Sequence, residues 1–288
     1  MTNNDIEKIT TEALGETLKC KVGQHKIAYH RKGKGQTIVF VHGITTYSFI
    51  WRKIIPLLKG YDMITIDLLG CGDSDKPLNE EYSLKHHSEI LFEFVNSLKL
   101  KKFNLVCHDV GGGIGQIFAV NYPRLIEKLV LINSVGYDFW PVQPIVLMKV
   151  PIIRQFAMAS LDAGAFHVII KRALYNKERL TPTLMELFWK PLKTKIGRKA
   201  FLHFIKCLDN KNLLDIEDKL PGLKTPVLII RGKADVYLSG EIAGKLHHDI
   251  PNSKLVKIEK CGHFMQEDEP EKIARHIDQF LKGSKSDG

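Results

Sequence analysis

The stretch Asn104-Leu-Val-Cys107-His-Asp109-Val-Gly111-Gly-Gly113 decides the fold of this chain. Its apolar start predicts a short buried strand, and its glycine-rich end predicts a helix that packs close to its neighbours. Asp109 therefore stands in a sharp strand-to-helix turn. The residues two positions away, Cys107 and Gly111, must be small because such a turn is tight and strained. The helix N-terminus beside the turn favours an anion, so the pattern predicts a nucleophile elbow with Asp109 as an exposed nucleophile.

Short apolar runs and amphipathic helical patterns alternate on both sides of this turn. Strands are expected at residues 18–22, 26–31, 37–41, 63–67, 104–107, 129–132, 226–230 and 254–258. Helices are expected at residues 47–58, 84–98, 114–121, 241–247 and 270–281. This alternation predicts an α/β fold with a mostly parallel, twisted sheet and helices on both of its faces.

Residues 137–214 follow a different pattern, with only helix-like segments and many large apolar side chains. We expect them to form a helical cap inserted after the sixth strand. Residues 1–136 and 215–288 are then expected to form one core domain. An apolar cap over the strand ends predicts a substrate pocket between the two parts, and a small, mainly apolar substrate.

Composition and charge narrow the class of protein. The 288 residues carry a formal net charge of +10, but the basic residues are spread along the chain. This predicts a solvated surface and no nucleic acid partner. Five cysteines without a CxxC pair, and a polar start without an apolar targeting segment, predict a cytoplasmic protein. No stretch is long enough for a membrane span. The sequence contains no metal, nucleotide or flavin motif, so we expect no cofactor, and it leaves monomer and homodimer open.

Four further motifs, taken with the elbow, make the chain resemble the α/β-hydrolase family over nearly its whole length. Val41-His-Gly-Ile44 resembles the family's HG oxyanion motif, and the run from Asp67 to Pro77 resembles its D-x-x-G-x-G-x-S-D-x-P loop. The run from Ile229 to Asp235 resembles the strand and loop that carry the catalytic acid. Cys261-Gly-His263-Phe264 resembles the histidine loop. The order nucleophile, acid, histidine is that of the family.

An aspartate at the elbow resembles the epoxide hydrolases and haloalkane dehalogenases of this family. The resemblance implies that Asp109 attacks an sp3 carbon and forms an alkyl-enzyme ester. His263 would then activate a water that hydrolyses the ester, and Asp235 would hold the imidazole in the right tautomer. The backbone N–H groups of Ile44 and Val110 would stabilise the oxyanion.

The leaving group separates the two subfamilies. Haloalkane dehalogenases usually bind the halide with a Trp after the nucleophile and an Asn after the HG pair, where this chain has Val110 and Ile44. Neither side chain can donate a hydrogen bond. Epoxide hydrolases use cap tyrosines as proton donors, for which Tyr137 and Tyr175 are the candidates. The family's HGxP motif has proline where this chain has Thr45.

The sequence predicts an epoxide hydrolase-like enzyme and leaves other functions open. They are a haloalkane dehalogenase with atypical halide ligands, a lyase or cofactor-free enzyme that uses proton transfer, and a ligand-binding protein without turnover. Structural roles are also open: Asp109 as a helix N-cap, Asp235 as a turn residue, and His263 as an ordinary loop histidine. For His42 and His108 a structural role is expected.

Overall fold

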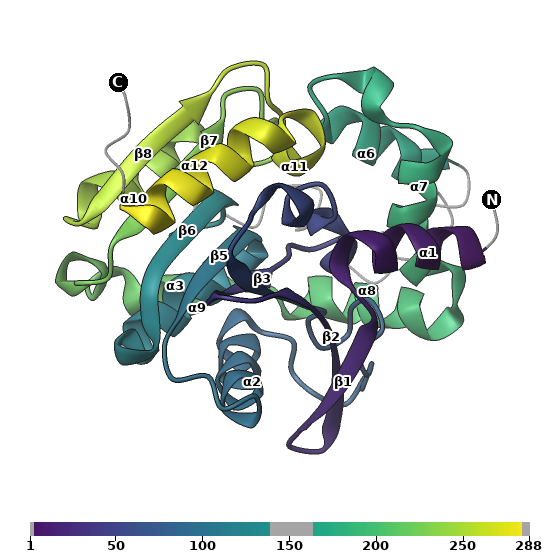
Figure 1. The fold of residues 1–288 in the computed structure, drawn as a ribbon, viewed down its shortest axis with the longest axis horizontal. Coiled ribbons are helices and arrows are strands. Elements are labelled where there is room, and N and C mark those ends of the chain that lie inside the picture. The colour runs from purple at the N-terminus through teal and green to yellow at the C-terminus, as the bar shows by residue number, and fades with distance from the viewer. Residues whose placement is uncertain (1–2, 139–163, 284–288) are drawn as a thin grey trace.

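An eight-stranded, mostly parallel sheet organises the computed structural model, which describes residues 3–138 and 164–283 (Figure 1). Its strands are β1 (Thr17–Val22), β2 (His25–Gly33), β3 (Gln36–Val41), β4 (Tyr61–Ile66), β5 (Phe103–Asp109), β6 (Ile126–Ser134), β7 (Val227–Gly232) and β8 (Ser253–Ile258). They lie in the order β1-β2-β4-β3-β5-β6-β7-β8. The pairs β1–β2 and β2–β4 are antiparallel, and all other pairs are parallel. The predicted α/β-hydrolase fold is confirmed.

Helices cover both faces of the sheet and bury its alternating side chains (Figure 1). One face packs against α2 (Leu84–Ser97), α3 (Val110–Asn121) and α10 (Gly240–Asp249). The other face packs against α12 (Pro270–Lys282) and the end of α1 (Asn3–Leu14). Strands β4, β5 and β7 are buried along their whole length. Burial on two faces explains their continuous apolar runs, which are typical of central parallel strands.

The strand order reverses between β3 and β5. The chain leaves β3 for β4 on one side of it and later returns to β5 on the other side. In open α/β sheets such a switch point creates a crevice beyond the carboxyl ends of the two strands. The loops after β3 and β5 therefore meet there, and they carry Ile44 and Asp109.

The helices that follow β6 contribute buried apolar side chains to the two hydrophobic clusters, one on each face of the sheet. They are α6 (Phe166–Ala173), α7 (Pro182–Trp189), α8 (Lys195–Cys207) and α9 (Lys211–Glu217). Phe188 of α7 packs edge-on against Phe49 and also contacts Phe264 beside the histidine loop. The expected cap boundary after residue 214 falls within α9, where Leu213 packs beside Gly113 of α3. The division into core and cap remains a prediction.

Two local expectations differ from the structure. Residues 47–58 form two short 3-10 turns, Ser48–Trp51 and Ile55–Leu57, where we expected a helix. Pro56 has no N–H group to continue a helical ladder, and the aromatic side chains of the first turn are buried in the core. Helix α1 was not predicted, because its polar sequence has few apolar positions. Among the described residues no helix is both long and apolar enough to cross a membrane.

Candidate active site

Asp109 ends β5 and stands immediately before α3 in a strained turn. Its φ of 55° and ψ of −123° are unfavourable for a residue with a side chain. A Cβ atom on Gly111 would lie 2.5 Å from the carbonyl oxygen of His42, and one on Gly43 would lie 2.5 Å from Oδ2 of Asp109. Both positions therefore require glycine, because the turn at Asp109 and the loop after β3 lie too close together for a Cβ atom.

The two carboxylate oxygens of Asp109 have different surroundings. Oδ2 accepts a hydrogen bond from the N–H of Ile44 over 2.9 Å, and the N–H of Val110, the first residue of α3, acts with it to lower the pKa of the carboxylate. Oδ1 faces Nε2 of His263 at 3.9 Å. Burial raises the pKa of Asp109 to about 6, against the lowering effect of His263 and the two N–H groups. One oxygen is therefore held by the backbone, and the other points to the imidazole.

His263 lies in the loop between β8 and α11 (Met265–Asp268), and its ring is oriented by Asp235. Nδ1 of His263 is 3.0 Å from Oδ2 of Asp235. Burial alone lowers the pKa of His263, but the carboxylates of Asp235 and Asp109 outweigh burial and raise it. Burial raises the pKa of Asp235, yet His263 and Arg231 bring it down to about 2. Asp235 is therefore a carboxylate at neutral pH, which keeps a proton on Nδ1.

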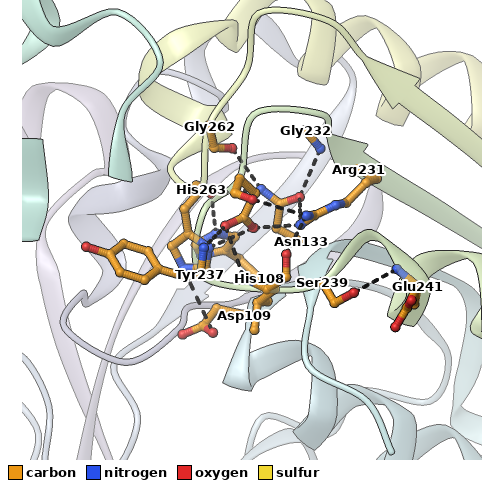
Figure 2. A network of polar contacts seen from close by, with 12 residues as sticks. His108, Asp109, Asn133, Arg231, Gly232, Tyr237, Ser239, Glu241, Gly262 and His263 are labelled. Carbon is orange, nitrogen blue, oxygen red and sulfur yellow. Dashed lines mark hydrogen bonds and ion pairs between the residues drawn. The ribbon is translucent and has the colours of Figure 1, made fainter. Parts of the chain in front are cut away.

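Asn133 and Arg231 form hydrogen bonds with the histidine loop and with Asp235, respectively. Both are labelled in Figure 2, and sequence reasoning missed both. Arg231 Nη1 donates to Asp235 Oδ2 over 2.7 Å. Asn133, at the end of β6, donates from Nδ2 to the carbonyl oxygens of Gly262 and His263. Its Oδ1 accepts from the N–H of Gly232 over 2.9 Å. The sequence did contain a signal for Asn133, because it is a polar residue directly after the apolar run 129–132. Asp235 likewise follows an apolar strand, β7, and the carboxyl ends of parallel strands meet at one edge of the sheet.

His42, beside the oxyanion loop, and His108, beside the nucleophile, each form hydrogen bonds between two loops. Nε2 of His42 accepts from the N–H of Leu68, and its Nδ1 is 2.8 Å from the carbonyl oxygen of Gly43. Nε2 of His108 is 3.0 Å from the carbonyl oxygen of His263. Each ring thus links a turn of the site to a second loop, which is a structural role.

The oxyanion loop has an unusual backbone at Thr45. Its φ is 65°, a value that the proline found here in the family cannot adopt, because its ring holds φ near −65°. The loop therefore differs locally from the family's HGxP form. The N–H of Ile44 nevertheless points at Asp109, and Thr46 stabilises the turn by donating from Oγ1 to the carbonyl oxygen of Gly43.

The two tyrosines expected as proton donors lie in different surroundings. Tyr137 is buried, and its hydroxyl donates to Oδ2 of Asp249 over 2.8 Å, with Lys245 Nζ 4.0 Å from its ring centroid. This direction argues against Tyr137 as a proton donor in the site. The backbone of Tyr175 lies beside the histidine loop, where its N–H donates to Asp268. Its side chain is 46% exposed.

Tyr237 and Asp268 connect the site to α6 and to the segment after it, and sequence reasoning did not find them. The Tyr237 ring packs edge-on against His263, with centroids 5.6 Å apart, and its hydroxyl donates to the carbonyl oxygen of Ile169 in α6. Asp268 accepts from the N–H groups of Gly262, Tyr175 and Asn176. The histidine loop and the segment after α6 are thereby tied to one carboxylate.

The arrangement contains the parts needed for covalent catalysis by a carboxylate. One oxygen of Asp109 accepts the N–H of Ile44, and the other faces a buried imidazole nitrogen 3.9 Å away without a hydrogen bond to it. In the part of the chain that the structure describes, no cluster of three or more His, Cys, Asp and Glu side chains could hold a metal ion.

Comparisons with known proteins identify the family and agree with the fold. The model of the alpha/beta hydrolase fold family matches residues 36–270. An uncharacterized hydrolase, YugF, of Bacillus subtilis is 30% identical over 258 residues, which cover 88% of this chain and 92% of that protein. A cis-3-alkyl-4-alkyloxetan-2-one decarboxylase of Shewanella oneidensis is 28% identical over 272 residues, covering 89% and 85%. The solved structure of a haloalkane dehalogenase, DbeA, of Bradyrhizobium elkani superposes with a TM-score of 0.83 at 22% identity, covering 93% and 98%, which is a likeness of fold.

Proposed function

This chain belongs to the α/β hydrolase family, and we propose that it is a hydrolase whose nucleophile is Asp109 and whose intermediate is an alkyl-enzyme ester. The observation that supports this proposal most directly is that the two carboxylate oxygens of Asp109 have different neighbours. Oδ2 is held by the N–H of Ile44, while Oδ1 faces His263. A helix N-cap would instead accept from the N–H groups of its own helix two or three residues on, and Asp109 makes no side-chain cap hydrogen bond.

In the first step, Oδ1 of Asp109 attacks an sp3 carbon of the substrate. A C–O bond forms, the bond from that carbon to the leaving group breaks, and the electron pair of the broken bond goes to the leaving oxygen. That oxygen takes up a proton. Of the two cap tyrosines considered as donors, Tyr175 remains the candidate, because the hydroxyl of Tyr137 is engaged by Asp249.

In the second step, Nε2 of His263 takes a proton from a water that attacks Cγ of Asp109. The former carbonyl oxygen, Oδ2, becomes the oxyanion in the N–H pair of Ile44 and Val110. The bond between Cγ and Oδ1 then breaks, and His263 returns the proton to the departing oxygen. The second proton of the water leaves the new carboxyl group and restores the proton donor of the first step. The product therefore leaves with Oδ1, and the water oxygen stays in the carboxylate. Asp235 stabilises the imidazolium throughout.

A strained cyclic ether, an epoxide, suits this site better than a haloalkane. A departing halide needs hydrogen-bond donors in an apolar pocket, and the side chains of Ile44 and Val110 supply none. When a ring opens, the leaving oxygen stays attached to the substrate and needs only a proton. A four-membered lactone is a second candidate substrate, since the protein from Shewanella oneidensis is named for decarboxylating one. Release of carbon dioxide would separate it from diol formation.

Replacement of His263 by Gln provides the direct test. His263→Gln should accumulate the ester, so the intact mass should rise by the mass of one epoxide when the protein is incubated with a panel of epoxides, lactones and haloalkanes. The adduct should be absent in the double variant with Asp109→Ala, while the exposed His247→Gln should turn over without an adduct. An unmodified mass across the whole panel would overturn the proposal in favour of proton-transfer chemistry or ligand binding.

A single turnover in 18O-labelled water tests the second step. Attack on Cγ should leave the label in the peptide that contains Asp109, and the first product formed should be unlabelled. A label in the first product would mean that water attacks the substrate directly, with Asp109 or His263 acting as a base.

A further inference from the structure

Asp235 shares one oxygen between His263 and Arg231. Its Oδ2 accepts from Nη1 of Arg231 over 2.7 Å and lies 3.0 Å from Nδ1 of His263. Its Oδ1 accepts from the backbone N–H groups of Tyr237 and Leu238 over 2.8 and 3.2 Å. The guanidinium and the imidazole therefore bind the same buried carboxylate oxygen, and the charge of Arg231 lies close to the ring of His263.

The guanidinium of Arg231 is fixed at this position. Arg231 is buried in β7. Its Nη1 also lies 3.3 Å from Oδ1 of Asn133, and its Nη2 donates to the carbonyl oxygens of Asp235 and Leu238. A guanidinium stays protonated in proteins, and buried charges interact more strongly than charges in water. Arg231 therefore supplies a permanent positive charge that water screens little.

Titratable and charged groups from several elements surround the imidazole of His263. They are Asp109 and His108 at the end of β5, Arg231 in β7, Asp235 and Tyr237 after β7, Asp268 in α11, and Arg172 in α6, whose charge acts on Tyr237. Burial lowers the pKa of His108 to about 3 and raises the pKa of Tyr237, so both rings are uncharged at neutral pH. Asp268 is bound by backbone N–H groups, and Arg172 is exposed. The charges that act on the imidazole are those of Asp109, Asp235 and Arg231.

The balance of these charges changes when the ester forms. In the free enzyme the imidazole faces two carboxylates and one guanidinium, and the pKa of His263 is raised. In the alkyl-enzyme ester Asp109 is uncharged, so Asp235 and Arg231 balance each other. Without Arg231, Asp235 alone would favour an imidazolium, which cannot take a proton from water. The guanidinium opposes this effect, since it lowers the pKa of His263.

We propose that Arg231 is a positioning residue whose charge, acting beside the shared oxygen of Asp235, keeps His263 unprotonated in the ester intermediate. This inference rests on the proposed function, because the second step of that reaction needs a neutral imidazole. It assigns Arg231 an electrostatic part in the reaction, in addition to the hydrogen bonds with which it closes the loop after β7.

NMR titration of the imidazole tests the charge of Arg231 without any substrate. The signal of His263 is assigned by its absence in His263→Gln. Arg231→Gln keeps an amide donor and removes the charge, so the midpoint of His263 should rise by about one pH unit. Arg231→Lys keeps the charge, and its midpoint should stay close to that of wild type. The matched control is Arg31→Gln, which breaks an arginine–aspartate pair with Asp62 in β2 and should leave the midpoint of His263 unchanged.

Hydrolysis of the ester connects this titration to the reaction. In single turnovers of an epoxide, the pH below which hydrolysis slows should rise in Arg231→Gln by the same amount as the midpoint of His263. It should not rise in Arg231→Lys. A shift of one unit corresponds to about tenfold slower hydrolysis at a pH below both midpoints. A purely structural role of Arg231 would lower the rate equally at every pH.

An unchanged midpoint in a folded Arg231→Gln protein would overturn the inference and leave Arg231 as a structural residue. Equal shifts in Arg231→Gln and Arg231→Lys would also overturn it, because the charge would not be the cause. A shifted midpoint without an ester in any variant would count against the proposed function alone.

A second pair of variants keeps the test open if Arg231→Gln does not fold, since removing one partner of a buried ion pair is costly. Asp235→Asn is then compared with the double variant Arg231→Gln/Asp235→Asn, in which neither buried charge is left alone. The double variant should titrate His263 about one pH unit higher, because the imidazolium is no longer repelled by Arg231. Equal midpoints in these two proteins would overturn the inference.

Discussion

Nε2 of His263 lies 3.9 Å from Oδ1 of Asp109, while the opposite nitrogen of the same ring lies 3.0 Å from Asp235. The second distance is that of a hydrogen bond and the first is too long for one. The imidazole is therefore fixed by the acid and only faces the nucleophile. Oδ1 of Asp109 therefore receives no hydrogen bond from the imidazole, and the short distances couple the charges of all three groups.

The rate of ester formation should depend on pH through Asp109. Only the carboxylate attacks, and burial raises its pKa to about 6. The single-turnover rate of wild type should therefore fall about tenfold per unit below about pH 6. In His263→Gln the positive charge that lowers this pKa is gone, so the midpoint should move to higher pH. Rapid quenching followed by mass spectrometry gives both profiles, and a midpoint near pH 4 in wild type would contradict a buried nucleophile.

The same pKa has a consequence for stability. A folded-state pKa of about 6, raised from 3.8, means that the folded protein binds a proton more tightly than the unfolded chain. The stability from Asp109 is thus fully present below about pH 4 and is lost as pH rises through about 6. Asp109→Asn has no carboxylate to ionise, so at pH 8 it should be more stable than wild type by up to about 3 kcal/mol.

At pH 4 most of that advantage of Asp109→Asn should disappear, because the folded wild type then carries a neutral side chain. Urea unfolding at the two pH values measures the difference, with Asp215→Asn as the control for an acidic residue outside the site. An advantage that is the same at both pH values would show that ionisation is not its cause.

Asn133 should be a major source of stability for the histidine loop. Its buried amide donates to Gly262 and His263 and accepts from Gly232, so Asn133→Ala leaves several buried backbone groups without partners. We expect a loss of about 3 kcal/mol in the free energy of unfolding. The control Asn252→Ala removes one hydrogen bond at an exposed position and should cost about 1 kcal/mol or less. Similar losses of unfolding free energy in Asn133→Ala and Asn252→Ala would refute the conclusion that Asn133 stabilises the histidine loop.

Asp268 should position His263 without touching the substrate. Its two oxygens accept three backbone N–H groups, so in Asp268→Asn either orientation of the amide turns an NH2 group toward an N–H donor. We expect kcat to fall about tenfold or more, as a small displacement of the imidazole is costly, and the unfolding free energy to fall by about 2 kcal/mol.

The control for this substitution is Asp278→Asn, whose carboxylate pairs with Tyr61 and Lys282 away from the site. It should leave kcat unchanged. An Asp268→Asn enzyme with normal kcat and lowered stability would reduce Asp268 to a structural residue.

The sequence by itself determined the alternation of strands and helices and the turn that carries Asp109. These features are encoded locally. Apolar periodicity decides which segments are strands, and the small residues Cys107 and Gly111 leave room for one sharp turn. The order of Asp109, Asp235 and His263 along the chain could also be read, because each follows a recognisable strand or loop.

Only the tertiary structure decided which side chains meet. Tyr137 was expected in the site, yet its hydroxyl is bound to Asp249 at the end of α10. Asn133 had no motif of its own, and it acquires its role because β6 lies between β5 and β7. One surface groove is lined by residues of β1 and by residues 190–196, more than 150 residues later in the chain. Residue type and local pattern carry no information on such contacts, since the direction of a side chain depends on the packing of distant segments around it.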